Sequence, residues 1–233
     1  LAAWHEEPRQ GFHCRRSSLH LHSLQAHLQR EAVQELHRLP SRQVAVIGDG
    51  FANMSSLLLG YAPNCRVILV NLSKTLLLDL VFLRQAFPDE NIALVQSADD
   101  MDEALADQDT RIIALQADNA ELLAQVPVTL GINILSMIEM EPQVTAAYFN
   151  ILRCCPTDKT VFYCANHLEK IWADGTIIRF YEYPCHDEDE YLVDEKCPWD
   201  QYGYRKRPPF YYRRPSLSLH RLLNLKKIKS SEI

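Results

Sequence analysis

The stretch from Gln43 to Leu59, QVAVIGDGFANMSSLLL, decides the fold of this chain. Its short apolar run, Val44 to Ile47, is broken by Gly48-Asp49-Gly50, and helix-compatible residues resume at Asn53. An apolar run without polar alternation is typical of a strand buried on both faces, as in the parallel sheets of α/β proteins. The stretch therefore predicts a buried strand, a tight turn and a helix.

The glycine turn has the features of a ligand site. Glycine is needed where the backbone takes a positive φ, or where a ligand comes too close for a Cβ atom. A helix beginning near Asn53 would aim its free N–H groups and its positive dipole end over the turn, where an anionic or carboxylate-bearing ligand could sit. Such a turn also occurs where nothing binds, and the third position of the dinucleotide pattern GxGxxG is Asn53 here. A cofactor site at Gly48, Asp49 and Gly50 is therefore a hypothesis that needs support from the next unit.

The second buried strand supplies that support. It runs from Arg66 to Asn71, RVILVN, and begins about twenty residues after the turn. In doubly wound folds the residue at the end of this strand reads a ribose hydroxyl, and it is usually Asp or Glu. Asn71 can still form hydrogen bonds but carries no charge. We expect Asn71 to contact a ribose.

Strands and helices alternate through the first two-thirds of the chain. Further strands are predicted at Asn91–Val95, Arg111–Leu115, Thr129–Leu135 and Thr160–Ala165, and helices at Lys74–Phe87, Asp99–Asp107 and Glu141–Cys154. This succession implies right-handed crossovers and a parallel sheet with helices on both faces. We expect an α/β fold, a Rossmann-like doubly wound and mostly parallel sheet, whose last clear core strand is Thr160–Ala165.

The chain divides into three regions. Residues 1–40 are predicted to be an N-terminal helical extension, residues 41–181 the core, and residues 182–233 a C-terminal segment that completes the same domain. Within the extension, Ser17 to Leu39 shows the apolar spacing of an amphipathic helix. Its four histidines fit a solvated helix surface better than a metal site: His20, His22, His27 and His37. The first residue is Leu, so the extension could be the remnant of a longer region.

Composition narrows the class of protein. The 233 residues carry a formal net charge of −6 and are 47% hydrophobic, which fits one sizeable domain with an appendage and argues against a general nucleic-acid binder. No apolar run has the length of a membrane span, and no signal-peptide pattern is visible. The seven cysteines form no CxxC pair, which indicates reduced thiols. We expect a cytoplasmic protein without a membrane, nucleic-acid or metal partner.

The C-terminal segment differs from the core in composition. An acidic run at 187–190 is followed by Pro198-Trp199 and by a basic, aromatic run from Tyr202 to Arg214. Aromatic faces beside charged hydrogen-bonding groups suit a sugar, so we expect a lid over an acceptor rather than more of the sheet. The basic run could instead contact nucleic-acid phosphates, or the segment could pack against a partner subunit. Cys185, His186 and Cys197 could begin a zinc site but lack a convincing fourth ligand.

Several segments resemble one known family. VAVIGDGFA, VILVNLSKTLLLDL, INILSMIEM and AAYFN, with FYCANHLEK, DGTIIRFYEYP, DEKCPWDQY and RPPFYY in the C-terminal third, are similar to the sugar O-methyltransferases that depend on S-adenosylmethionine. The resemblance spans Gln43 to Leu223, and SMxEM and DExCPW are its narrower motifs. The chain departs from the family at Asn71, where many methyltransferases carry an acid, and at His167, where an Arg is expected.

The resemblance implies roles for individual residues. Gly48, Asp49 and Gly50 would line the methionine and ribose side of S-adenosylmethionine, and Asn71 with Leu72 would meet the ribose and adenine. Asp118 and Asn119 would lie beside the adenine ring. Asp118 could instead cap the segment that follows it.

Methyl transfer to an alcohol needs a base as well as a cofactor. The enzyme must align the donor with the hydroxyl and must accept the hydroxyl's proton. Such a base should lie past the carboxyl edge of the sheet, and three residues are candidates: Glu139, His167 and His220. Glu139 could instead orient a loop, His167 could be a surface residue, and His220 lies in the tail but could fold back.

Two classes of function follow. The first is an S-adenosylmethionine-dependent O-methyltransferase acting on a hydroxyl of a sugar or glycosylated small molecule. The second is a catalytically lapsed methyltransferase fold that serves as a binding or assembly module of a larger protein.

Overall fold

The computed structural model describes residues 42–62, 64–197, 202–204, 207–208, 211–213 and 218–228. The chain divides into two compact units, with the boundary between Asp118 and Asn119. The predicted helix Ser17–Leu39 and Trp199 lie outside the described residues.

The first unit contains four parallel strands in the spatial order β3-β4-β2-β1. Their bounds are Arg42–Ile47 for β1, Cys65–Asn71 for β2, Asn91–Val95 for β3 and Thr110–Gln116 for β4. Every residue of β2 is buried, as expected for a strand covered on both faces. The predicted parallel arrangement and the predicted strands are confirmed here.

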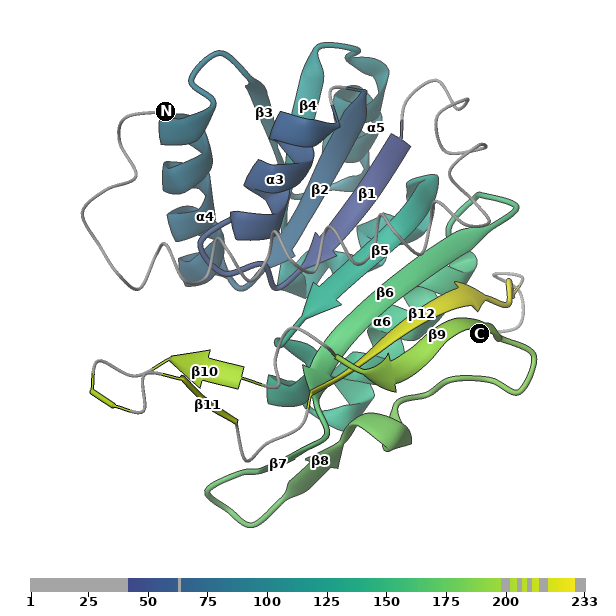
Figure 1. Cartoon of the computed structure of the whole chain (residues 1–233). Coiled ribbons are helices and arrows are strands. Elements are labelled where there is room, and N and C mark those ends of the chain that lie inside the picture. The colour runs from purple at the N-terminus through teal and green to yellow at the C-terminus, as the bar shows by residue number, and fades with distance from the viewer. Residues whose placement is uncertain are drawn as a thin grey trace. The chain divides into compact units, whose positions relative to one another are not determined.

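Three helices connect these strands: α3 (Asn53–Tyr61), α4 (Ser73–Ala86) and α5 (Ala98–Ala106). The paths from β1 to β2 and from β2 to β3 lead across the sheet in one direction, and the path from β3 to β4 leads back. Because crossovers are right-handed, α3 and α4 must cover one face and α5 the other. Figure 1 shows this arrangement, with α3 and α4 in front of the strands and α5 behind them.

The second unit begins with a short helix, η1 (Ala117–Gln125), which starts just before the boundary and leads into β5 (Val128–Ile134). The turn η2 (Met137–Glu139) and helix α6 (Pro142–Cys154) connect β5 to the parallel strand β6 (Thr160–His167). The helix begins with Pro142, because proline is tolerated in a first turn. The predicted helix and both predicted strands are confirmed.

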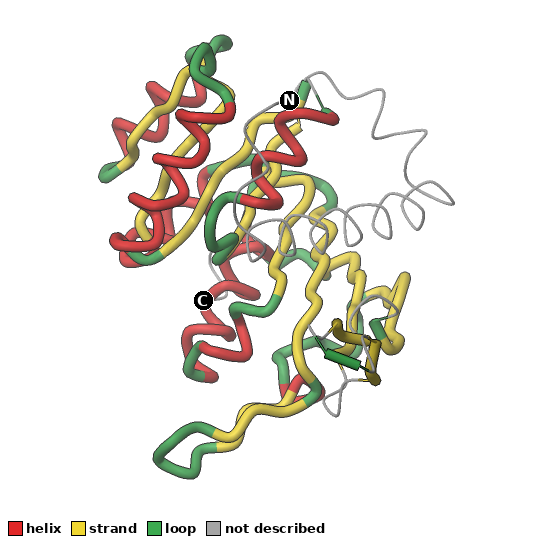
Figure 2. The backbone as a smooth tube through the Cα atoms, turned by 60° about the vertical axis from the view of Figure 1, so that its left-hand side comes forward, coloured by secondary structure: helices red, strands yellow, loops and turns green. Residues whose placement is uncertain are grey.

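Smaller elements follow β6. The hairpin of β7 (Glu169–Ile171) and β8 (Ile177–Arg179) leads to η3 (Phe180–Glu182) and β9 (Glu190–Lys196), and the chain continues through β10 (Tyr202–Tyr204), β11 (Tyr211–Arg213) and β12 (Ser218–Leu225). Figure 2, with helices red and strands yellow, shows the β7–β8 hairpin at its lower left.

The prediction that the chain after Glu182 adds nothing to the sheet is wrong. Strand β12 pairs antiparallel with β6 and with β9, which gives the order β5-β6-β12-β9 in the second unit. Thr160–Ala165 is therefore not the last core strand. The sequence concealed β12 because His220 and Arg221 interrupt its apolar pattern, and both side chains are buried against polar partners.

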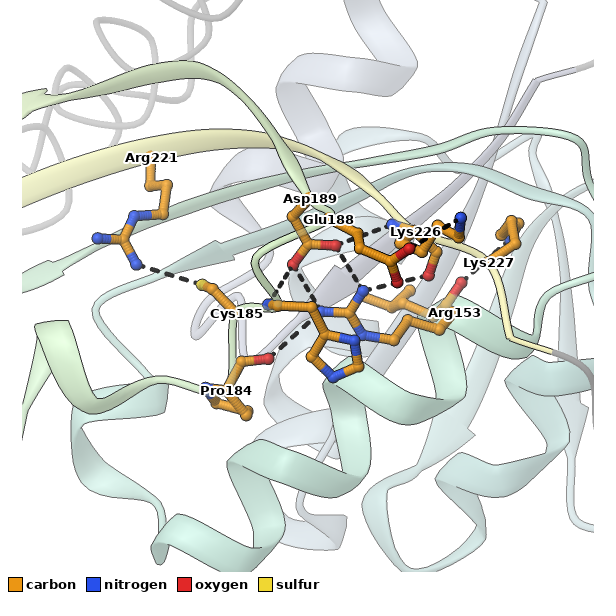
Figure 3. A network of polar contacts seen from close by, with 10 residues as sticks. Arg153, Pro184, Cys185, Glu188, Asp189, Arg221, Lys226 and Lys227 are labelled. Carbon is orange, nitrogen blue, oxygen red and sulfur yellow. Dashed lines mark hydrogen bonds and ion pairs between the residues drawn. The ribbon is translucent and has the colours of Figure 1, made fainter. Parts of the chain in front are cut away.

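A buried ion pair between Arg153 and Asp189 connects helix α6 to the end of this sheet (Figure 3). Arg153 donates to both carboxylate oxygens of Asp189, at 2.5 and 2.6 Å, and neither side chain is exposed. Arg153 also donates to the carbonyl oxygens of Pro184 and Lys226. Asp189 in turn accepts from the backbone N–H groups of His186 and Lys226. The pair therefore joins the helix to the turn before β9 and to the end of β12.

Within the described part of the chain, no helix is both long enough and apolar enough to cross a membrane. The six cysteines found there are all free thiols.

Candidate functional site

The residues predicted to hold a cofactor converge at one edge of the first unit. The backbone N–H of Gly48 donates to the carbonyl oxygen of Val70 at 2.8 Å, so the turn after β1 lies beside the end of β2. Asn71 is paired in register with Gln116 at the end of β4. The carboxyl ends of three neighbouring strands thus bring Gly48, Asn71 and Asp118 to the same edge.

The glycine turn has a strained backbone. Four of its residues have positive φ angles: Gly48 at 69°, Gly50 at 56°, Phe51 at 64° and Ala52 at 49°. This region is free of cost for glycine but disfavoured for residues with a Cβ, and such strain persists where neighbouring contacts enforce it. A Cβ placed on Gly50 would meet no atom of the described residues within 4 Å. The described part of the chain therefore leaves space for a ligand over Gly50.

Asp49 caps the helix that follows the turn. Its two carboxylate oxygens accept from the backbone N–H groups of Met54 and Ser55, at 2.8 and 2.7 Å. The expectation that the first N–H groups of this helix are free for an anionic ligand is wrong for these two. The chain itself supplies the negative charge that the positive end of the helix dipole favours.

We expect Asp49 to make the stability of the fold depend on pH. Burial raises the pKa of Asp49 to about 6, although hydrogen bonds from Ser55 and Met54 oppose the shift. Between the unfolded value of about 3.9 and this pKa, the folded protein holds the proton more tightly than the unfolded chain. The free energy of unfolding should therefore fall as the pH rises toward and through 6.

Urea denaturation at a series of pH values between 4.5 and 7.5 tests this expectation. The parent should lose stability with rising pH relative to Asp49→Asn, which has no titrating group at this position. Parallel pH profiles for the two proteins would contradict it.

Asn71 is held by its neighbours. Its side-chain Nδ2 donates to Asp79 at 2.7 Å, and its Oδ1 accepts from the backbone N–H of Leu72 at 2.9 Å. Asp79 also accepts from the backbone N–H of Ala52, at 2.9 Å. Asp79 is not among the site residues predicted from the sequence. The sequence does contain an indication of its role, because Asp79 is the one acid in the apolar helical stretch LLLDLVFL.

Two large apolar side chains flank the turn. Leu72 is 65% exposed and Phe51 is 49% exposed, and Phe51 contacts the ring of Phe82 edge-on. Asp118 is exposed and accepts a hydrogen bond from the side chain of Gln116 at 2.8 Å. Asn119 follows it in η1. The edge thus combines apolar surface with hydrogen-bonding groups, the combination that a nucleoside needs.

Two candidate bases lie after the strands of the second unit. Glu139 ends η2 and is 60% exposed, and its carboxylate forms an ion pair with Lys170 Nζ at 2.5 Å. His167 ends β6, and its Nδ1 lies 2.9 Å from Ser218 Oγ.

The third candidate base, His220, is inside the sheet. It is 0% exposed, and its ring nitrogens lie 3.3 Å from Tyr163 Oη and 3.3 Å from Glu195 Oε1. His220 belongs to β12, so the C-terminal segment folds back onto the sheet at this residue. Its burial keeps it from touching an acceptor in this conformation.

Two buried asparagines hold the turn that leads to Glu139. Asn133 accepts from the backbone N–H of Met137, and Asn166 accepts from that of Ile138, both at 3.2 Å. Asn166 also donates to Asn133 at 2.9 Å. Leu135, just before the turn, has a positive φ of 62°. Strain of this kind in an over-determined turn is typical of functional sites, because it fixes the groups that follow.

The residues that the structure describes contain no cluster of three or more His, Cys, Asp or Glu side chains arranged to hold a metal ion. Cys185, His186 and Cys197 are among the described residues, so they do not belong to such a cluster there.

Comparison with known proteins identifies the fold. No family model matches the chain, and no curated protein matches its sequence. Among solved structures, a protein from Galdieria sulphuraria assigned as a sarcosine dimethylglycine methyltransferase is similar with a TM-score of 0.55 and 12% identity, over 89% of this chain and 87% of that one. An O-methyltransferase family 2 protein from Planctomyces limnophilus, in complex with apigenin, has a TM-score of 0.46 and 10% identity, over 78% of this chain and 50% of that one.

This chain thus spans most of the Galdieria protein but about half the length of the Planctomyces protein. The first likeness shows a Rossmann-like α/β fold with a mostly parallel sheet, as the sequence predicts.

Proposed function

We propose that this chain is an S-adenosylmethionine-dependent methyltransferase that moves a methyl group to a hydroxyl of a small molecule. The observation that carries the proposal is the glycine turn. Gly50 has a positive φ, and among the described residues no atom fills the space where a Cβ would be. The exposed side chain of Phe51 follows it in the turn, and the exposed Leu72 follows the end of the neighbouring strand β2. The sequence resemblance to sugar O-methyltransferases supports the same assignment.

The residues of the first unit fit the cofactor as follows. The backbone of the turn from Gly48 to Gly50 would approach its methionine and ribose portions, and at Gly50 no side chain is present to block that approach. Leu72 would offer an apolar contact to the adenine, and Asp118 with Asn119 would offer hydrogen-bond partners to the edge of the ring. Asn71 would contact the ribose hydroxyls.

The cofactor would supply an electrophilic methyl group on a sulfonium. The chain must then align the acceptor hydroxyl and take its proton. We infer that Glu139 is the first candidate for this base, with His167 second. Glu139 is exposed and ends a turn braced by Asn133 and Asn166, and Lys170 holds its carboxylate in place.

We infer that the acceptor is a sugar or a glycosylated small molecule. The support is the resemblance in the segments FYCANHLEK, DGTIIRFYEYP and DEKCPWDQY. Among the described residues of that region, Tyr181 is 63% exposed and offers an aromatic ring on which a sugar can stack. Tyr191 is also exposed, but the guanidinium of Arg221 lies over its ring. The segment after Tyr183 is proposed to select the acceptor.

Calorimetric titration of the full chain with S-adenosylmethionine and S-adenosylhomocysteine tests the function. We expect both to bind with dissociation constants in the micromolar range, about −8 kcal/mol. A panel of sugars and glycosides would then be screened with a methyl-labelled donor. No binding of either compound contradicts the proposal, and binding without transfer to any hydroxyl favours the lapsed binding module.

Glu139→Gln should lower kcat for the acceptor found in that screen by about 10²–10⁴-fold, because the amide cannot take the proton. Its affinity for S-adenosylhomocysteine should stay within about twofold, since the change spares the fold and removes no proposed cofactor contact. Glu141→Gln is the matched control, with the same charge change two residues away, and should keep its kcat. Equal kcat values in the two variants would exclude Glu139 as the base and leave His167→Gln to be tested in the same way.

A further inference from the structure

Asp79 is a carboxylate buried on an apolar face of helix α4. It lies on α4 and is 0% exposed, between the buried side chains of Leu76 and Leu83. Among the described residues no Lys, Arg or His forms an ion pair with it. Burial raises its pKa, although hydrogen bonds from Asn71, Ala52 and Phe51 oppose the shift. The side chain at such a buried position of a helix is ordinarily apolar, because burying a carboxylate costs free energy unless hydrogen bonds compensate it.

The hydrogen bonds that Asp79 accepts explain why a carboxylate is buried at this position. Asp79 Oδ1 accepts from the backbone N–H of Ala52, in the strained glycine turn, at 2.9 Å. Asp79 Oδ2 accepts from the side chain of Asn71, at the end of β2, at 2.7 Å. One carboxylate therefore joins the two parts of the chain that are proposed to hold the methionine and the ribose.

The same contacts fix the orientation of the Asn71 amide. A carboxylate can only accept, so it must face the NH₂ group of Asn71, and the amide oxygen then faces the backbone N–H of Leu72. One N–H of the amide and one lone pair of its oxygen remain. These are a donor and an acceptor, and a ribose hydroxyl can pair with either of them.

We propose that Asp79 is a positioning residue of the cofactor site, which supplies from helix α4 the carboxylate that doubly wound folds usually carry at the end of the second strand. In those folds the acid itself contacts the ribose. Here the neutral Asn71 makes the contact, and Asp79 orients Asn71 and holds the glycine turn against it. This inference rests on the proposed function.

Exchanging the two residues tests the proposal. Asp79→Asn replaces one acceptor oxygen by an NH₂ group, so at least one of the donors that now bond to Asp79 loses its partner. Asn71→Asp places two carboxylates in contact, and they must share a proton. The double variant Asn71→Asp with Asp79→Asn restores the two donor–acceptor pairs on which the proposal rests, the one with Ala52 and the one between positions 71 and 79. In it, the new amide on α4 can accept from the backbone N–H of Ala52 and donate to the new carboxylate at the end of β2.

The measurement is the affinity of the full chain for S-adenosylhomocysteine. Each single variant should bind at least about tenfold more weakly, and the double variant should return to within about threefold of the parent. The weakening in Asn71→Asp should diminish as the pH is lowered, because the shared proton is then taken up. Asp100→Asn, in the capping box of α5, is the control and should not change the affinity.

The outcomes separate this proposal from the proposed function. Unchanged affinity in Asp79→Asn overturns the positioning role, as does a folded double variant that binds no better than the single variants. If the parent does not bind S-adenosylhomocysteine, the proposed function fails. The positioning role is then decided by hydrogen exchange at the Ala52 and Leu72 amides, which should quicken in both single variants and recover in the double variant; no recovery overturns it.

Discussion

Replacing Arg153 by alanine is expected to lower the free energy of unfolding by about 3–5 kcal/mol, because it leaves Asp189 as a buried charge without a partner. Neither side chain of the pair is exposed. The loss would also free the carbonyl oxygens of Pro184 and Lys226 from their donor. Urea denaturation at pH 7, followed by circular dichroism, measures the effect.

Two controls show whether burial causes this loss. Arg179→Ala removes an exposed arginine that pairs with Glu169 and Glu182, and it should cost less than about 1 kcal/mol. The double variant Arg153→Met with Asp189→Leu should lose less than the two single changes added together, because no buried charge is then unpaired. Equal losses in Arg153→Ala and Arg179→Ala would contradict the role assigned to the buried pair.

The pair should also make the protein sensitive to acid. Burial alone would raise the pKa of Asp189, but hydrogen bonds from Arg153, Lys226 and His186 outweigh it and lower the pKa below its usual value. A lowered pKa contributes stability that is present above the unfolded value of about 3.9 and is lost as the pH falls through the folded value. The difference in stability between the parent and Arg153→Ala should therefore shrink below pH 4.

Gly50→Val is expected to weaken the binding of S-adenosylhomocysteine by more than about 100-fold, or 2.7 kcal/mol. The branched side chain would occupy space that the described residues leave open, where the cofactor is proposed to bind, and the positive φ of 56° is disfavoured for a residue with a Cβ. Calorimetric titration measures the affinity. The cost to stability should stay near 1–2 kcal/mol, the strain of one residue in this region.

Gly175→Val is the matched control. Gly175, in the turn between β7 and β8, also has a positive φ, at 90°, and also has open space at its Cβ. The substitution should cause a similar loss of stability and leave the affinity for S-adenosylhomocysteine unchanged. If Gly50→Val bound as tightly as the parent, the glycine turn would not be the cofactor site.

The sequence by itself determined the alternation of strands and helices. The predicted strand Asn91–Val95 coincides with β3, and Arg111–Leu115 lies within β4. The predicted helix over Glu141–Cys154 is α6. Apolar runs, proline and glycine determine these elements locally, so they can be predicted from the sequence alone.

The position of the glycine turn and of Asn71 at one edge of the sheet also follows from the sequence, because parallel strands place their carboxyl ends together. The partners of their side chains do not follow. Asp49 caps the backbone N–H groups of Met54 and Ser55 only because the turn brings its carboxylate to them. The positive φ angles of Gly48 and Gly50 agree with their residue type, but those of Phe51 and Ala52 have no signature in the sequence.

Only the tertiary structure decided what becomes of the buried polar residues. From the linear sequence alone, three residues would be expected at the surface or in a catalytic site, since charged and polar side chains avoid the interior: Asp79, Asp189 and His220. Each is buried because its partners come from elsewhere, such as Asn71 for Asp79, Arg153 for Asp189 and Tyr163 for His220. Hydrogen bonds over separations of 8, 36 and 57 residues offset the cost of removing these groups from water, and no local pattern records them.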